Sequence, residues 1–233
     1  VDSATTLALA VSALGSENVT GLIMPFIYTE SVELASGHAE SLKVEIKELN
    51  ISSVVESFKA STTSFSSKAS EGNLHSRVRM TFLYGEAFHS GSLVMGTSNK
   101  SELLVGYYTK WGDGPSDFLP MGDLYKSQVY LLAEDLGIPK RILDRKPTAE
   151  LWEGQTDEDD LGIDYATLDQ ILLGLESQLS FKRISSKIGI DPESVERIGN
   201  LIKLSIHKRV FPPVCKIGLR TVGLDWRETI GSR

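Results

Sequence analysis

Short apolar segments alternate with stretches of helical periodicity along the first hundred residues, and this alternation admits few folds. Three segments have the length and composition of strands, namely 19–24 (VTGLIM), 44–49 and 92–96 (SLVMG). Three others carry apolar side chains at helical spacing, namely 4–14, 32–42 and a long stretch that Asn73 is placed to cap. Strands separated by helices in this order pair in parallel through right-handed crossovers. The alternation therefore predicts an α/β fold, a Rossmann-like doubly wound parallel sheet flanked by helices.

The second half of the chain is more helical. Residues 124–136 and 165–179 have helical periodicity. The sequence Asp191-Pro192-Glu193 is a strong helix start, because it combines a capping side chain, a ring-fixed first position and an acidic first turn. That last helix is expected to end near His207. We predict a single domain over residues 1–233, with the helical C-terminal part packed on the sheet.

Composition restricts the class of protein. Of the 233 residues, 41% are hydrophobic and 24% charged, as in ordinary soluble globular proteins. The 24 Lys and Arg against 31 Asp and Glu give a net charge of −7, which argues against nucleic-acid or anionic-membrane partners. The single cysteine, Cys215, suits a reducing, cytoplasmic setting. No run of about eighteen apolar residues predicts a membrane-spanning helix.

Residues 106–123 (GYYTKWGDGPSDFLPMGD) do not resemble scaffold. They lack sustained periodicity and contain four glycines, two prolines and four aromatic residues. A loop of this length inside a compact domain is usually functional or disordered, and the aromatic content argues against disorder. The alternative is a surface loop with incidental aromatics. We predict a binding loop that follows a strand, where open α/β sheets hold ligands.

Thr97 and Glu102 follow the predicted strand at 92–96. A carboxylate there is placed to hold a divalent cation together with a nucleotide's phosphates. The structural alternative is an acid favoured by the dipole at a helix start, and for Glu102 taken alone this alternative is the stronger.

Two charged clusters also admit two interpretations. The four consecutive acids 157–160 fit a solvated loop or a helix start, whereas the neighbouring Trp152 makes a mobile lid a fair competitor. His207, Lys208 and Arg209 lie at the predicted end of the last helix. For Arg209 we expect an interaction with the helix C-terminus, and His207 fits a packed or capping histidine as well as a ligand contact.

Taken together, these segments resemble the NAD synthetases, specifically the ammonia-dependent type. The resemblance covers nearly the whole chain and preserves the order of its blocks, so it is far more specific than a lone glycine motif. The blocks are NLHSRVRM, GTSNKSELLVGYYTKWGDGPSDFLPMGDLYKSQV, TAELWEGQTDEDDLGIDYATLD, HKRVFPP and VGLDWRE.

The resemblance implies a ligase that amidates deamido-NAD to NAD with ATP and ammonia. In that family ATP first transfers AMP to the pyridine carboxylate, releasing pyrophosphate, and ammonia then displaces AMP from the acyl adenylate. Magnesium neutralises the phosphates. No protein nucleophile is required, and Cys215 is interpreted as structural. The resemblance also implies a cytoplasmic homodimer with the dinucleotide bound near the subunit interface.

The same resemblance assigns residues to the two substrates. The residues matched to ATP contacts are Asp2, Ser3, Thr97, Lys126 and Thr148. Those matched to deamido-NAD contacts are Arg77, Lys110, Asp117, His207 and Lys208. Asp2 and Glu102 match the two magnesium carboxylates.

The beginning of the chain departs from the family pattern. The family carries a Ser-Gly-Gly-x-Asp-Ser phosphate loop, of which Val1-Asp2-Ser3 fits only the last part. We expect the missing part upstream of Val1, as a short apolar strand that ends in Ser-Gly-Gly. The length leaves no room for a glutaminase domain, so free ammonia is the expected nitrogen donor.

Two other classes of function remain open at this point. One is a different ATP pyrophosphatase, such as a GMP-synthetase-like amidase or a tRNA-thiolating enzyme, although one cysteine and a charge of −7 argue against the latter. The other is a non-catalytic nucleotide-binding or assembly subunit, which the incomplete phosphate loop supports.

Overall fold

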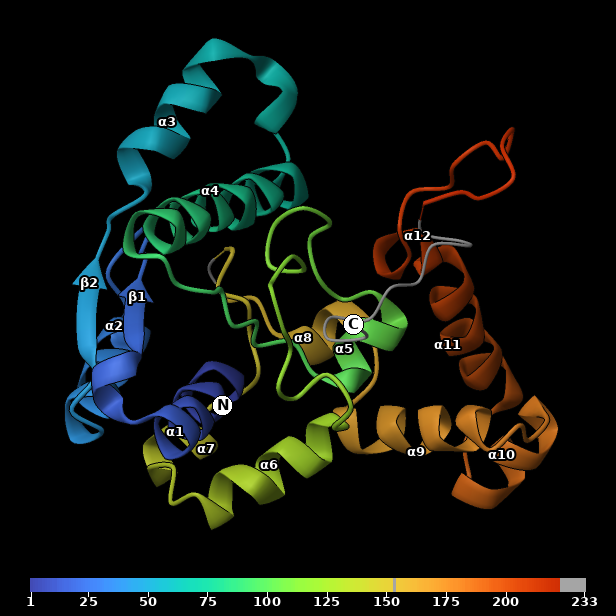
Figure 1. Cartoon of the computed structure of the whole chain (residues 1–233). Coiled ribbons are helices and arrows are strands. Elements are labelled where there is room, and N and C mark those ends of the chain that lie inside the picture. The colour runs from blue at the N-terminus through green and yellow to red at the C-terminus, as the bar shows by residue number, and fades with distance from the viewer. Residues whose placement is uncertain (153, 223–233) are drawn as a thin grey trace.

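Two parallel strands and a surrounding set of helices form the computed structural model, which describes residues 1–152 and 154–222 (Figure 1). Strands β1 (Thr20–Ile23) and β2 (Glu45–Glu48) pair in parallel, with Gly21 opposite Ile46. Helix α2 (Glu30–Ser41) connects them and packs on both. The predicted α/β fold with parallel strands is confirmed.

The first helix packs against segments from the middle of the chain. Helix α1 (Asp2–Leu14) ends at Gly15, as its apolar spacing predicts, and the 3-10 turn η1 (Ser16–Asn18) leads into β1. Ala4 and Ala8 of α1 are buried with Ala133 and Ile138. The burial of these side chains fixes the position of the N-terminal end of α1 relative to the segments that carry the other site residues.

Residues 92–96 differ from the prediction of a full strand. Only one parallel bridge forms there, between Met95 and Phe118. The Gly96 amide donates to the Phe118 carbonyl at 2.9 Å. The pairing partner of this segment therefore belongs to residues 106–123, which we call the aromatic loop. Leu93 is 71% exposed, and an apolar run with an exposed member does not make a buried strand.

The long helix begins earlier than predicted. Helix α3 (Ser52–Ser61) and the 3-10 turn η2 (Thr63–Phe65) are followed by α4 (Lys68–Ser90). Ser67 caps α4 in a capping box with Ser70, so the prediction that Asn73 caps this helix is wrong. The start of α4 is difficult to predict because the sequence before it is rich in serine, and Ser67 is one of several candidate caps there.

The remaining elements are helices, and most are short. In chain order they are α5 (Lys100–Val105), α6 (Lys126–Asp135), α7 (Lys140–Leu143), α8 (Asp157–Leu161), α9 (Tyr165–Glu176), α10 (Phe181–Ile188), α11 (Pro192–Leu204) and α12 (Ile206–Arg209). The predicted start of α11 is confirmed, since the Asp191 side chain accepts from the Ser194 amide at 2.7 Å.

The C-terminal helices share one apolar cluster with α5. Its fully buried members include Leu168, Ile171, Val195 and Ile198. Figure 1 shows α9 to α12 on the side of the molecule away from β1 and β2, and their contacts are with α5 and α6. The predicted helical C-terminal part therefore forms, and it joins the rest of the fold through helices.

Two further predictions concern membrane-spanning helices and the last sequence block. Among residues 1–152 and 154–222, no helix is both long and apolar enough to cross a membrane. Of the block VGLDWRE, only Val222 belongs to the described residues.

Candidate active site

Three charged side chains from distant parts of the chain meet in one buried cluster. The Lys126 ammonium donates to an Asp2 carboxylate oxygen at 2.5 Å and to a Glu102 carboxylate oxygen at 3.2 Å. The side chain of Lys126 is 1% exposed, that of Asp2 20% and that of Glu102 14%. The two carboxylates predicted to share a cation therefore lie together, joined by the predicted phosphate-binding lysine.

Local helix chemistry explains why Glu102 points this way. Asn99 caps α5, and its side chain accepts from the Glu102 amide at 3.0 Å while the Glu102 carboxylate accepts from the Asn99 amide at 3.3 Å. This is a capping box, which fixes the acid at the third helical position. The Asn99 amide group also donates to Asp2 at 2.9 Å. Asn99 is a site residue that the sequence analysis missed, although the spacing of Asn99 and Glu102 signals the cap.

Burial shapes the charges in this cluster. Burial and the neighbouring Asp2 raise the pKa of Glu102 to about 7. Burial alone lowers the pKa of Lys126, but the carboxylates of Asp2 and Glu102 outweigh it and hold that pKa above its usual value. The same ammonium holds the pKa of Asp2 below its usual value against the effect of burial. The site therefore keeps a fixed lysine cation between two acids, and one of these acids is close to protonation near neutrality.

The start of α6, which carries Lys126, is fixed by a second buried acid. The Lys126 amide donates to the Ser101 hydroxyl at 2.9 Å, and Ser101 in turn donates to Asp169 of α9. Asp169 also accepts from the Ser127 amide at 2.8 Å and from the Ser127 hydroxyl. One carboxylate thus ties the starts of α5 and α6 to α9.

The acidic segment folds as the helix start that was one of its two interpretations. Thr156 caps α8, and Asp157 is 5% exposed, whereas Asp159 and Asp160 face solvent. The Asp160 carboxylate accepts from the Tyr107 hydroxyl at 2.8 Å and from the Gln155 amide group at 2.9 Å. These bonds attach the segment to the first turn of the aromatic loop.

Asp157 itself points inward. One of its oxygens accepts from the Tyr165 hydroxyl at 3.1 Å, and the other is buried without a hydrogen-bond partner. The Tyr165 ring lies against the Lys126 ammonium, 4.9 Å from ring centroid to Nζ. Tyr165 is a further residue that sequence reasoning did not single out, because a tyrosine at a helix start has an ordinary packing interpretation. Asp157 was considered only as one of the four acids 157–160.

The predicted dinucleotide contacts form a second group on the aromatic loop and α12. Lys110 Nζ lies 3.3 Å from His207 Nδ1, and the Arg77 guanidinium donates to the Lys110 carbonyl at 3.3 Å. Lys208 donates to the carbonyls of Gly106 and Tyr108, each at 2.6 Å. Four predicted residues from three distant segments therefore surround one stretch of the loop.

Other predicted residues lie outside these two groups. Asp117 accepts from the Val94 amide at 2.7 Å, so its carboxylate holds the loop to the preceding segment. Thr148 accepts from the Glu150 amide at 3.0 Å, and the side chains of Ser3 and Thr97 face solvent. Arg209 donates to carbonyls near the ends of α5 and α11, at 2.7 Å for Leu104 and 2.6 Å for Ile202, as its helix-terminal interpretation predicts.

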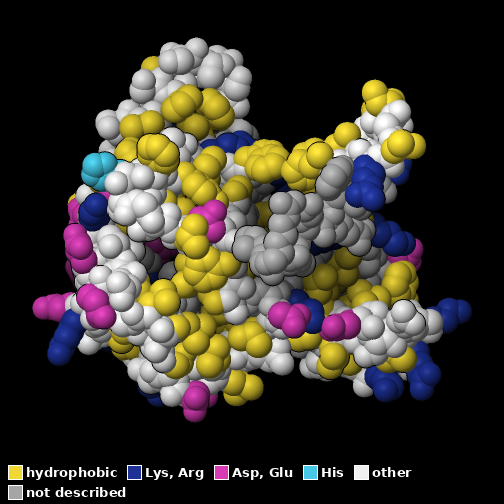
Figure 2. Space-filling view, in the orientation of Figure 1, with side chains coloured by type: hydrophobic (Ala, Val, Ile, Leu, Met, Phe, Trp, Pro, Cys, Tyr) yellow, Lys and Arg dark blue, Asp and Glu magenta, His cyan; other side chains and the backbone are white. Residues whose placement is uncertain are grey.

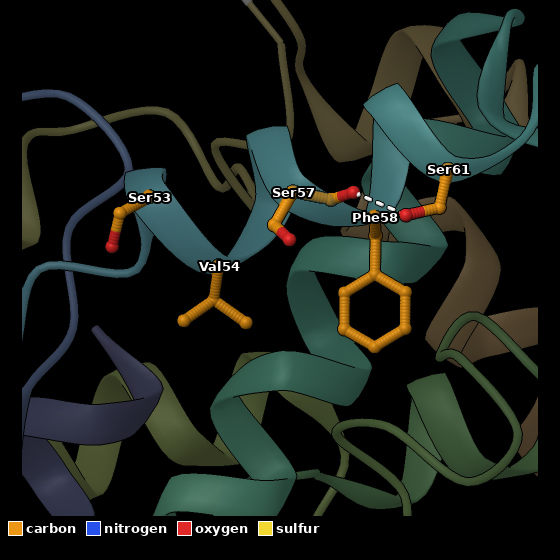
Figure 3. Close-up of a pocket in the computed structure, with 5 residues that line it drawn as sticks. All are labelled: Ser53, Val54, Ser57, Phe58 and Ser61. Carbon is orange, nitrogen blue, oxygen red and sulfur yellow. Dashed lines mark hydrogen bonds between the residues drawn. The ribbon is translucent and has the colours of Figure 1, made fainter.

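A pocket elsewhere lacks this chemistry. It has a volume of about 320 Å³ and lies on α3, where Ser53, Val54, Ser57, Phe58 and Ser61 line it. Figure 3 shows these side chains along one helix, with the Ser61 hydroxyl donating to the Ser57 carbonyl at 2.8 Å. It contains no ionisable side chain, so the charged cluster is the better candidate site.

Comparison with known proteins identifies the family. The family model described as NAD synthase matches residues 1–212. The chain belongs to the NAD synthase family. The NH3-dependent NAD+ synthetase of Thermococcus kodakarensis is 48% identical over 213 residues, a match that covers 91% of this chain and 84% of that protein. The protein of the same name from Archaeoglobus fulgidus is 47% identical and covers 93% and 85%.

Solved structures share the fold. An NMN synthetase from Francisella tularensis superposes with a TM-score of 0.79 at 36% identity, covering 92% of this chain and 84% of that one. The NH3-dependent NAD synthetase from Campylobacter jejuni gives 0.77 at 30% identity, covering 92% and 85%. The NAD synthase fold therefore extends over the elements that carry the charged cluster.

Proposed function

We propose that this chain is an ammonia-dependent NAD+ synthetase, a ligase of NAD biosynthesis that amidates deamido-NAD to NAD with ATP and ammonia. The observation that carries the proposal is the meeting of Asp2, Glu102 and Lys126 in a chain of the NAD synthase family. Relatives above 40% identity that bear this enzyme's name support it.

The chemistry explains why such a cluster is needed. A pyridine carboxylate is a poor electrophile, so its oxygen must first be converted into a good leaving group. Attack of the carboxylate on the α-phosphorus of ATP forms the acyl adenylate and releases pyrophosphate. Ammonia then attacks the acyl carbon, AMP departs with the carbon–oxygen bond electrons, and the nitrogen loses its extra proton. Each step moves negative charge onto phosphate oxygens, which a fixed buried cation stabilises.

On the ATP side, Lys126 is the phosphate-binding cation. Its burial and its bonds to two acids hold it in place, so little reorganisation is needed when charge develops on the departing pyrophosphate. We assign Ser3, Thr97 and Thr148 as hydroxyl contacts to ATP. The exposure of Ser3 and Thr97 leaves these hydroxyls accessible to a ligand.

The residues present fit a magnesium ion. Asp2 and Glu102 supply the hard oxygen ligands that this ion prefers. Burial and the neighbouring Asp2 raise the pKa of Glu102, and a bound cation would favour its charged form. Among the described residues no group of three or more His, Cys, Asp or Glu could hold a metal. Asp2 and Glu102 would therefore share the ion with substrate phosphates and water, and it would neutralise phosphate charge when bound.

On the dinucleotide side, a group of basic residues binds the pyrophosphate and the pyridine carboxylate of deamido-NAD. Arg77, Lys110 and Lys208 present cations suited to both anions. Two of the three Lys208 donors go to loop carbonyls, which orients the ammonium and leaves one donor for a ligand. His207 extends this group, and Asp117 is assigned to a ribose hydroxyl.

A homodimer in the cytoplasm completes the proposal. Near the end of α4, Phe88 is 92% exposed and Leu93 is 71% exposed. Figure 2 shows apolar side chains spread over the upper part of this face. Large apolar groups that face solvent favour burial against a second copy. Light scattering on the purified protein should therefore give twice the chain mass, and the chain mass alone would contradict the dimer.

One alternative substrate has specific support. The Francisella tularensis structure bears the name NMN synthetase, so nicotinate mononucleotide is a second candidate acceptor of the amide. Both substrates carry the same pyridine carboxylate, and only the dinucleotide adds a pyrophosphate and an adenosine. The extended basic group of Arg77, Lys110 and Lys208 favours the dinucleotide.

A substrate comparison tests the function. The purified protein is incubated with ATP, magnesium and ammonium chloride, together with deamido-NAD, nicotinate mononucleotide or xanthosine monophosphate. We expect one AMP for each NAD formed, with the highest kcat/KM for deamido-NAD. A higher kcat/KM for nicotinate mononucleotide would favour the alternative. AMP release with xanthosine monophosphate, but with neither of the other two acceptors, would reject the assignment.

A further inference from the structure

The buried acid Asp157 lies beside the charged cluster, close enough for its charge to interact with Lys126, and the Tyr165 side chain lies between them. Asp157 is 5% exposed, one of its oxygens makes no hydrogen bond, and the Tyr107 hydroxyl lies close enough to lower its pKa against the effect of burial. Burial raises the pKa of this carboxyl. A buried acid that leaves one oxygen unsatisfied is unfavourable for folding, and such groups are retained where they serve a function.

Tyr165 connects Asp157 to the lysine. Its hydroxyl donates to Asp157 at 3.1 Å, and its ring lies 4.9 Å from the Lys126 ammonium. Burial and the surrounding acids raise the pKa of Tyr165, so the hydroxyl stays protonated and remains a donor at all physiological pH values. An ammonium over a tyrosine face is attracted by the ring quadrupole, and the attraction depends on how the ring is held.

We propose that Asp157 is a positioning residue for the adenylation step, which fixes the Tyr165 ring and through it the Lys126 ammonium. The inference rests on the proposed function, because it assumes that Lys126 binds the phosphates of ATP. It gives the first residue of α8 a role in the adenylation step, in addition to the bonds by which Asp2 and Glu102 hold Lys126.

The bonds of the rest of the segment support this connection. Asp160 accepts from Tyr107 and from Gln155, so α8 is attached to the aromatic loop at Tyr107. Tyr165 begins α9, and the Tyr165 amide donates to Glu158 at 3.1 Å. The acidic helix and the tyrosine are therefore linked through both the backbone amide and the side chain of Tyr165.

Four variants separate a hydrogen-bond relay from a charge effect. Tyr165→Phe keeps the ring but removes the donor, and Asp157→Ala removes the acceptor. Asp157→Asn removes the charge but keeps an oxygen that accepts from Tyr165. The double variant Tyr165→Phe with Asp157→Ala tests whether the two single changes report one interaction. Asp159→Asn is the matched control, because it makes the same charge change on the exposed side of α8.

The relay predicts a specific pattern in the steady-state constants. Tyr165→Phe and Asp157→Ala should each raise the KM for ATP about fivefold, the factor expected for one hydrogen bond. The double variant should be no worse than either single variant. Asp157→Asn should restore the KM to within about twofold of the wild type. The KM for deamido-NAD should be unchanged throughout, which a general loss of structure would not produce.

Three outcomes would overturn the inference. One is a wild-type KM for ATP in Tyr165→Phe, and another is an equal defect in Asp157→Asn and Asp157→Ala, since the charge would then matter and not the bond. The third is an equal loss for ATP and deamido-NAD. If Asp157→Ala does not fold, Tyr165→Phe and Asp157→Asn still decide. Direct calorimetry of ATP binding to the same proteins separates this failure from failure of the proposed function, which would appear as absent deamido-NAD turnover in the wild type.

Discussion

The carboxylate of Glu102 divides its two oxygens between the backbone of α5 and the ammonium of Lys126. The capping box accounts for the direction in which the side chain leaves the helix, and burial accounts for the strength of its interaction with the lysine. From the sequence, Glu102 is either an acid at a helix start or a carboxylate that holds a cation. In the folded protein Glu102 takes part in the cap and also contacts Lys126, so a cap at this position is no evidence against a role in binding.

The two roles of Glu102 can be separated by Glu102→Gln. Glutamine serves equally well in a capping box, so the unfolding temperature should change by only a few degrees. The lost charge should slow pyrophosphate release roughly a hundredfold, the order found when one electrostatic contact to a transition state is removed. A stopped-time assay of pyrophosphate measures this directly. Release at the wild-type rate would contradict the proposed metal and phosphate role.

At Lys110 the expected defect is selective. Lys110→Met keeps an unbranched side chain but removes the cation that lies beside His207. Loss of one charge-assisted contact should weaken deamido-NAD binding about tenfold or more and leave ATP binding within about twofold. Calorimetric titration of each ligand gives both constants, and Lys187→Met in α10 is a control for lost surface charge. Equal losses for both ligands would contradict a dinucleotide-specific contact.

The three charged residues of the cluster were predicted from the resemblance to the NAD synthetases and not from their spacing in the sequence. Asp2, Glu102 and Lys126 are separated by about a hundred residues or lie on different helices, and no local pattern joins them. Asn99 could have been found from its capping spacing to Glu102. Tyr165 could not, because its contact with Lys126 depends on how α9 packs against α6.

Short helices position the cluster, and hydrogen bonds join the N-terminal ends of these helices. Asp169 of α9 accepts from Ser101 and from Ser127, and Ser101 accepts from the Lys126 amide. A helix of ten residues such as α6 is not stable by itself, so its start must be fixed by tertiary contacts. This carboxylate is 6% exposed and Ser101 is fully buried, whereas Ser127 lies at the surface.

Removal of this link should be costly. Asp169→Ala leaves two hydroxyls and the Ser127 amide without their acceptor, which we expect to lower the free energy of unfolding by about 3 kcal/mol. Urea denaturation measures the loss. The conservative variant Asp169→Asn, which keeps an acceptor oxygen, should lose less. A loss below about 1 kcal/mol for Asp169→Ala would contradict the role of this network.

The elements that sequence predicts best are those with strong local signals. The start of α11 combines an Asp cap with proline and is found where predicted. Residues 92–96 have the composition of a strand, yet they form one bridge, because the partner is a loop and Leu93 stays in solvent. The start of α4 was misplaced since several serines compete as caps. Local chemistry fixes caps, whereas sheet pairing depends on segments that are distant in sequence.

Over the whole molecule, the cluster lies where two apolar cores meet. Tyr125, next to Lys126, belongs to the core of the C-terminal helices, while Ala133 of the same helix belongs to the core that contains α1. The site therefore assembles only when both cores are packed. Because a substitution in either core changes the site indirectly, the stability of the whole fold and the activity are linked.

That stability should depend on pH through at least two buried groups that act in opposite directions. His75 is 2% exposed, and neither ring nitrogen makes a hydrogen bond, although Glu71 Oε1 lies 3.9 Å from Nε2. Burial, followed by the charge of Arg79, lowers its pKa below the usual 6.5. The unfolded chain then binds the proton first, so unfolding becomes easier as the pH falls through that value. The raised pKa of Glu102, about 7, has the opposite effect, because the folded protein takes up that proton first.

A difference measurement isolates the histidine from these opposing effects. We expect the free energy of unfolding of His75→Gln to fall less steeply than that of the wild type between about pH 7 and pH 5, with a slope difference of at most about 1.4 kcal/mol per pH unit. Any constant penalty of a buried glutamine cancels, because only slopes are compared. His89→Gln is the matched control, since it makes the same substitution at an exposed position of the same helix. Parallel curves for the wild type and His75→Gln would mean that His75 keeps an ordinary pKa in the folded protein.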